Sequence, residues 1–98
     1  MSFRLILAIF LTLSPAAHAG PIEKACLKAD RSKATRALCS CIQDVADTSL
    51  NNKDQAEAAS FFEDPQKAQD TRMSDNPQKE KFWERYKNWT ERASKVCG

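Results

Sequence analysis

The chain has 98 residues, of which 42% are hydrophobic and 29% charged, and its formal net charge at pH 7 is +2. This near-neutral balance, with charges of both signs interleaved, argues against a nucleic-acid-binding protein and against a polybasic membrane binder. A chain of this length forms one small domain whose hydrophobic core alone supplies little stability.

Residues 1–19 have the pattern of a secretory signal peptide. Arg4 supplies the basic n-region, residues 5–13 form an apolar stretch, and the Ala-His-Ala sequence at 17–19 is a small-x-small cleavage site. The apolar stretch is too short to span a bilayer, which takes about 20 residues, so no membrane anchor is expected after processing. We therefore expect cleavage after Ala19 and a periplasmic or secreted domain of residues 20–98.

This mature part is expected to be an all-α, disulfide-stapled bundle of four to five helices. Its only glycines are Gly20 and Gly98, and alanine, lysine, glutamate and glutamine fill the interior, which favours helices over β-hairpins. A first short helix spans 21–28, with its proline near the start. A second helix, capped by Asp30 or Ser32, spans 33–49.

Asparagine and proline signals place the remaining helices. Asn51 and Asn52 end the second helix and cap a third, which runs through Phe62. Asp64-Pro65 opens a fourth helix toward residue 73, and Asn76-Pro77 opens the last helix, which runs to about residue 96. The polar stretches 51–54 and 74–81 are expected to be connectors.

Two of these helices carry apolar stripes typical of core-facing helices. The stripe of the second helix comprises Leu38, Cys41, Ile42, Val45 and Ala46, and the stripe of the last helix comprises Phe82, Tyr86, Trp89, Ala93 and Val96. Trp83 lies at the edge of the stripe of the last helix. Together with Arg85, it is the candidate surface for a partner.

Four cysteines, Cys26, Cys39, Cys41 and Cys97, remain in the mature part, and an even number in a short exported chain is typical of a disulfide framework. Cys39 and Cys41 project about 200° apart on a helix, which disfavours a bridge between them. The turn after the first helix brings Cys26 closer to Cys39 than to Cys41. We expect Cys26–Cys39 with Cys41–Cys97; the main alternative is Cys26–Cys41 with Cys39–Cys97, and Cys39–Cys41 comes third.

The residues needed for common enzymes are missing from the mature part. The only histidine, His18, leaves with the leader, so no imidazole remains for a general base, a catalytic triad or a metal site. Without internal glycine no phosphate-binding loop can form. We therefore expect no catalytic residue, no metal and no cofactor; a redox pair and a four-thiolate metal site are the weaker interpretations of the cysteines.

The chain resembles a group of short exported proteins of marine and related alphaproteobacteria, whose members often carry the label "arginine transporter". The shared residues are Ala25-Cys26, Arg36-Ala37-Leu38-Cys39-Ser40-Cys41-Ile42-Gln43, Val45-Ala46, Phe61-Phe62, Asp64-Pro65, Phe82-Trp83, Arg85-Tyr86 and Cys97. The resemblance implies no catalytic residue. A chain without a spanning helix cannot itself carry a solute across a bilayer, so the label implies at most an accessory or solute-binding role in arginine uptake.

The most direct functional hypothesis is a non-catalytic exported module that binds a protein or small-molecule partner. The accessory role in arginine uptake is one alternative, and a thiol–disulfide protein that uses Cys39 and Cys41 is another. A guanidinium ligand requires a pocket lined by carboxylates that can bind it bidentately.

Overall fold

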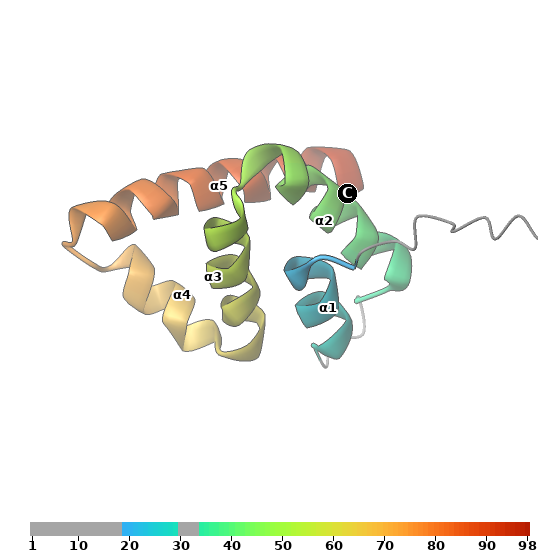
Figure 1. Cartoon of the computed structure of the whole chain (residues 1–98), viewed down its shortest axis with the longest axis horizontal. Coiled ribbons are helices and arrows are strands. Elements are labelled where there is room, and N and C mark those ends of the chain that lie inside the picture. Colours follow the sequence, from blue (N-terminus) through green and yellow to red (C-terminus); the bar gives the residue numbers. More distant parts are fainter. Residues whose placement is uncertain (1–18, 30–33) are drawn as a thin grey trace, which may run out of the picture.

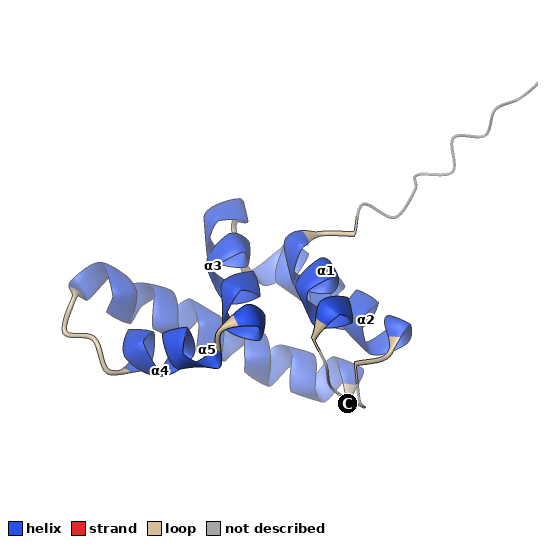
Figure 2. Ribbon diagram, turned by 90° about the horizontal axis from the view of Figure 1, so that it is seen from below, coloured by secondary structure: helices blue, strands red, loops and turns tan. Residues whose placement is uncertain are grey.

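The computed structural model describes residues 19–29 and 34–98, and these residues form helices and loops without a strand. The helices are α1 (Pro21–Lys28), α2 (Arg36–Ser49), α3 (Asn52–Glu63), α4 (Pro65–Arg72) and α5 (Pro77–Cys97). The long helix α5 runs the length of the molecule; α2 lies against its C-terminal half, and α3 and α4 cover the rest (Figure 1). Helix α1 packs beside α2 and α3, and short loops join α2 to α3, α3 to α4 and α4 to α5 (Figure 2). The expected all-α bundle is confirmed.

The start of the second helix differs from the expectation. Helix α2 begins at Arg36, three residues later than the expected start, because Thr35 is its N-cap and accepts a hydrogen bond from the Leu38 amide at 3.1 Å. The expected caps Asp30 and Ser32 lie outside the described residues, as does the expected leader up to residue 18.

The caps expected for the later helices are confirmed. Asn51 accepts from the Asp54 amide at 2.8 Å, and Asp64 accepts from the Gln66 amide at 3.1 Å. Asn76 accepts from the amides of both residues 78 and 79, at 2.9 and 3.2 Å. These side chains satisfy helix-end donors that would otherwise lack a partner, which fixes where each helix starts.

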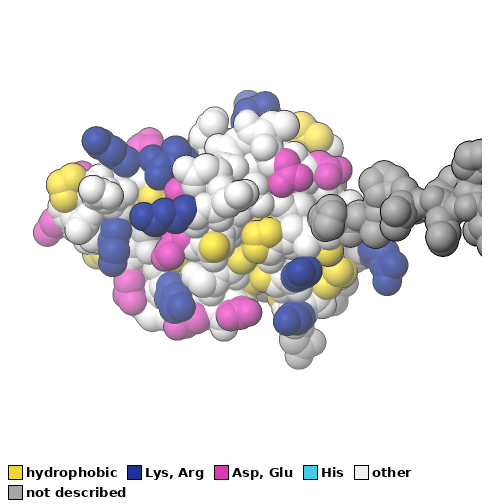
Figure 3. Space-filling view, viewed as in Figure 1, with side chains coloured by type: hydrophobic (Ala, Val, Ile, Leu, Met, Phe, Trp, Pro, Cys, Tyr) yellow, Lys and Arg dark blue, Asp and Glu magenta, His cyan; other side chains and the backbone are white. Residues whose placement is uncertain are grey.

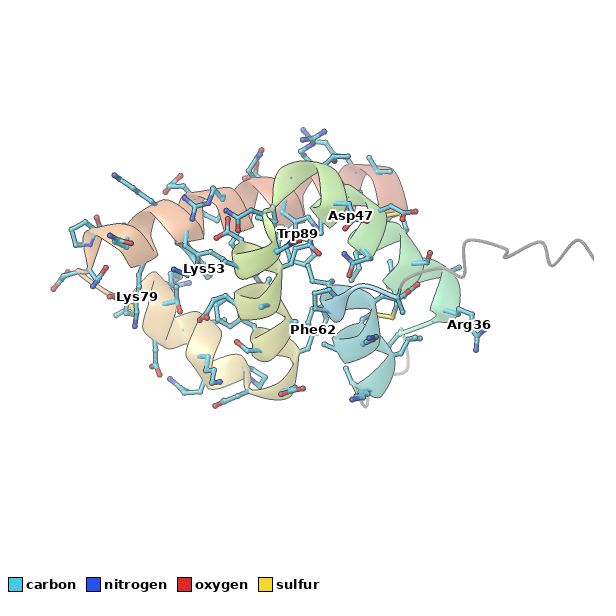
Figure 4. The ribbon with its side chains drawn as sticks, viewed as in Figure 1. Arg36, Asp47, Lys53, Phe62, Lys79 and Trp89 are labelled. Carbon is cyan, nitrogen blue, oxygen red and sulfur yellow. A yellow bond between two sulfur atoms is a disulfide. The ribbon has the colours of Figure 1, made fainter. Side chains whose placement is uncertain are left out.

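The hydrophobic core lies where α1, α2, α3 and α5 meet. Its buried members are Ile22, Ala46, Leu50, Ala58 and Trp89. Trp89 is 3% exposed and its indole Nε1–H donates to the Ile42 carbonyl oxygen at 3.0 Å, which joins α5 to α2 (Figure 4). Val96, expected on the core stripe, is 70% exposed. The bond from Cys97 to α2 turns that residue inward, so Val96, about 100° around the helix, faces solvent.

Two disulfides staple this arrangement, and they have the expected pairing. Cys26–Cys39 joins α1 to α2 with a Cα–Cα distance of 5.5 Å, and Cys41–Cys97 joins α2 to α5 with 5.8 Å. No cysteine of the described part is free. Disulfides of this kind persist in oxidising compartments. Among the described helices, none combines the length and apolar character needed to cross a membrane.

A buried polar network connects α1, α2 and α3. The Gln43 side-chain oxygen accepts from the amides of Ile22 and Glu23, at 2.9 and 3.0 Å, in the first turn of α1. Its Nε2 donates to Asp47 Oδ1 at 2.8 Å and to Gln55 Oε1 at 2.7 Å. Because every polar group of this side chain has a partner, the network tolerates burial and fixes how the three helices meet.

Candidate functional site

A pocket of about 430 Å³ opens between α3, α4 and α5. Its lining mixes charged, polar and apolar side chains: Asn51, Lys53, Asp54, Glu57, Thr71, Gln78, Lys79, Phe82 and Arg85. Lys and Arg side chains gather over this half of the molecule, with acidic side chains among them (Figure 3). We refer to this hollow as the α3–α4–α5 pocket. Its volume is in the range of small-molecule sites, about 300–1,000 Å³.

An ion pair between α5 and α3 forms one wall of the pocket. Arg85 donates through Nε to Asp54 Oδ2 at 2.6 Å and through Nη2 to Asp54 Oδ1 at 3.0 Å, a bidentate geometry. The Asp54 side chain is 5% exposed and the Arg85 side chain 45%. The side-chain hydrogen bond with Asp54 is the main cause that raises the pKa of Arg85, which stays charged.

The local sequence explains why the acidic partner lies at this point. Asp54 is in the first turn of α3, where a carboxylate interacts favourably with the positive end of the helix dipole. Because Asn51 caps α3 by accepting from the Asp54 amide, the Asp54 carboxylate is not needed as a cap. Both of its oxygens accept from Arg85. The pair therefore holds the guanidinium in a fixed orientation at the pocket wall.

Two lysines of the pocket have no partner in the described part of the chain. Lys53 and Lys79 make neither a hydrogen bond through their side chains nor an ion pair. Lys53 comes from the first turn of α3 and Lys79 from the first turn of α5, and both line the pocket (Figure 4). Since Arg85 neutralises Asp54, Glu57 is the one remaining carboxylate of the lining. The pocket is therefore positive, and Phe82 gives it an apolar portion.

The two residues of the candidate partner surface lie apart. Trp83 is half-buried and stacks on Tyr86 with ring centroids 4.9 Å apart, and it borders a different recess at the α4–α5 end. Arg85, two residues further, points about 200° around the helix into the α3–α4–α5 pocket. Of this pair, only Arg85 belongs to the pocket.

All four cysteines lie in disulfides that join helices. Cys39 is fully buried in its bridge to Cys26, and Cys41 is bonded across to α5, so the two do not form a local pair. Within residues 19–29 and 34–98, no group of three or more His, Cys, Asp or Glu side chains is arranged to hold a metal ion.

A second hollow, of about 320 Å³, lies between α2 and the end of α5. Leu38, Ile42 and Ala93 are among its mostly apolar lining residues, and no charged side chain reaches it. Apart from the hydroxyls of Thr90 and Ser94 and the Gly98 end, its lining is apolar, so it offers no charged side chain to a ligand.

No family model matches the chain. Neither a curated protein nor a solved structure has significant similarity to it. The resemblance to exported alphaproteobacterial proteins stays a prediction, and functional reasoning starts from the pocket itself.

Most of the pocket was not predicted from the sequence. Stretches 51–54 and 74–81, expected to be mere connectors, supply both lysines and Asp54. One signal was present, because an asparagine cap is followed by a lysine within three residues at the start of both α3 and α5. The Asp54–Arg85 pair, 31 residues apart in the chain, has no local signal.

Proposed function

We propose that the protein is an exported, non-catalytic binding module and that the α3–α4–α5 pocket holds a small organic anion. The observation that carries this proposal is the pair of lysines, Lys53 and Lys79, that lack partners beside a pocket of about 430 Å³. The export part rests on the signal-peptide pattern of residues 1–19 and fits the two disulfides.

The lining favours a ligand that combines a carboxylate or similar anion with a short apolar portion. The lysines supply ammonium donors, and Arg85 has N–H groups beyond the two that bind Asp54. Because Asp54 already fixes the guanidinium, little side-chain entropy is lost when a ligand binds to it. Phe82 offers apolar contact next to these cations.

The same charges argue against arginine as the ligand. A guanidinium binds best to a carboxylate with two free oxygens, and both oxygens of Asp54 are occupied by Arg85. Glu57 alone would face the two lysines as well as the ligand. The thiol–disulfide alternative has less support, since Cys39 and Cys41 belong to different bridges. A non-catalytic role fits the absence of histidine from residues 20–98.

Thermal-shift and calorimetric titrations of the chain 20–98 test the proposal. The panel is succinate, benzoate, glutamate, inorganic phosphate and arginine. We expect at least one carboxylate to bind, and a ligand at 100 times its Kd stabilises the fold by about 2.7 kcal/mol. Binding of arginine alone, or of nothing in the panel, would contradict the proposal.

A charge-matched pair of variants shows where the ligand binds. Lys53→Gln with Lys79→Gln removes both pocket lysines, and we expect it to weaken carboxylate binding at least tenfold, about 1.4 kcal/mol. Lys67→Gln with Lys95→Gln removes the same charge at exposed positions outside the pocket. Equal affinities of the two double variants would show that the carboxylate binds elsewhere or is attracted only by net charge.

A further inference from the structure

The first turn of α1 contains a glutamate whose carboxylate has no donor among the described residues. Glu23 is 8% exposed, and its side chain makes no hydrogen bond or ion pair with the residues that the structure describes. The amides of Ile22 and Glu23 are both taken up by Gln43. No side-chain oxygen of the described residues is both buried and unpartnered, so the Glu23 carboxylate reaches solvent and is free to accept a further donor.

The chain enters α1 through a glycine whose replacement would displace the Gln43 side chain. Gly20 is the N-cap of α1, and a Cβ atom there would overlap the Gln43 side chain. Gln43 cannot easily move aside, because it is held by hydrogen bonds to α1, Asp47 and Gln55. The backbone at Gly20 therefore lies in close contact with the Gln43 side chain of the buried polar network.

The relative positions of these two residues suggest a donor for Glu23. When Glu occupies the third helical position, as Glu23 does after the Gly20 N-cap, its side chain can reach back to the N-cap nitrogen. That nitrogen is the one released by cleavage after Ala19. Hydrolysis of the Ala19–Gly20 bond by a leader endopeptidase consumes one water and yields a carboxylate on Ala19 and an α-ammonium on Gly20.

We propose that removal of the leader completes the cap of α1, because the new α-ammonium of Gly20 forms an ion pair with the Glu23 carboxylate. The inference rests on the export part of the proposed function, which supplies the cleavage. An amide nitrogen offers one neutral N–H, whereas the ammonium offers three donors and a positive charge, and charge-assisted hydrogen bonds are the stronger ones. The ion pair fixes the first turn of α1, whose amides Gln43 binds. Processing therefore stabilises the contact of α1 with α2 and α3.

The test compares three N-termini on the chain 20–98 with both disulfides formed: a free Gly20 amine, an N-acetylated Gly20, and an extension by Ala19. Each is made with Glu23 and with Glu23→Gln. Acetylation keeps the N–H but removes the charge, and the extension moves the ammonium away. We expect both changes to lower the Tm of the Glu23 protein by about 4–8 °C, the shift produced by 1 kcal/mol in a domain of this size. With Glu23→Gln, the same changes should shift the Tm by less than about 2 °C.

Glu63→Gln, at an exposed position of α3, is the matched control and should respond to acetylation as the parent protein does. Equal shifts in the Glu23 and Glu23→Gln backgrounds, or no shift in the parent, would overturn the proposal. Because the protein for this test is prepared without residues 1–19, the result does not depend on export or on ligand binding. N-terminal sequencing of the secreted protein tests the cleavage separately, and a first residue other than Gly20 would contradict the export prediction while leaving the stability result intact.

Discussion

Replacement of Gln43 by leucine should be among the most destabilising single substitutions in the protein. Gln43 is 3% exposed and joins the first turn of α1 to α2 and α3 through four hydrogen bonds. Leucine has a similar volume but can neither accept nor donate a hydrogen bond. The amides of Ile22 and Glu23 would lose their acceptor, and Gln55 Oε1 would lose its donor.

The expected loss follows from these three groups. Each buried polar group left without a partner costs about 1–3 kcal/mol. Taking the lower end, because the start of α1 can be rehydrated, the loss is about 3 kcal/mol. At about 0.05–0.15 kcal/mol per residue, a domain of this size has a total stability of about 4–12 kcal/mol. The variant should therefore melt about 12–24 °C lower.

Urea unfolding monitored by far-UV circular dichroism and tryptophan fluorescence measures this loss. Gln69→Leu makes the same chemical change at an exposed position of α4 and should alter stability by less than about 0.5 kcal/mol. Gln43→Glu keeps the acceptor for α1 but sets an anion against Asp47 Oδ1 and Gln55 Oε1, so it should also destabilise. If Gln43→Leu cost no more than Gln69→Leu, the polar network would not hold the three helices together.

Three further predictions concern the contacts of α5. Replacing Cys41 and Cys97 by serine opens a loop whose ends are 56 residues apart, which should cost roughly 4 kcal/mol in the chain-entropy model; a loss below about 1 kcal/mol in urea unfolding would contradict that model here. Asp54→Asn should cost about 1 kcal/mol, since its partner Arg85 is partly solvent-screened. Because the pKa of Arg85 is raised, Arg85 stays charged in the neutral range and loses this contribution only as the pH rises through that pKa, so the difference between the parent and Asp54→Asn should stay constant from about pH 6 to 9. A steep change within that range would implicate another titrating group. Trp89→Phe removes an indole hydrogen bond from a buried position and should cost about 1–2 kcal/mol, and unchanged stability would show that the bond to α2 is dispensable.

Much of the secondary structure could be predicted because its signals are local. The capping residues act within one helical turn, so they fix the helix starts independently of the tertiary structure. They are Asn51, Asp64-Pro65 and Asn76-Pro77. The disulfide pairing followed from helical geometry and the short turn after α1. Thr35 was missed as a cap because other capping residues precede it in the sequence.

The site could not be predicted in the same way, because its contacts join distant parts of the chain. Gln43 has nothing in the sequence that distinguishes it from an exposed glutamine, and its role depends on where α1 and α3 lie. Asp54 and Arg85 meet only after α3 packs against α5. Lys53 and Lys79 have the same pattern as solvated surface lysines, and the pocket between them exists only in the folded arrangement.

The most direct test of the anion-binding pocket is a ¹⁵N–¹H correlation spectrum of the chain 20–98 titrated with succinate and with benzoate. Binding in the α3–α4–α5 pocket predicts saturable shifts of the amides of Lys53, Asp54, Thr71, Lys79 and Arg85, while amides around the apolar hollow between α2 and α5 stay unchanged. Shifts centred on Leu38, Ile42 and Ala93, or no saturable shift with either carboxylate, would contradict it.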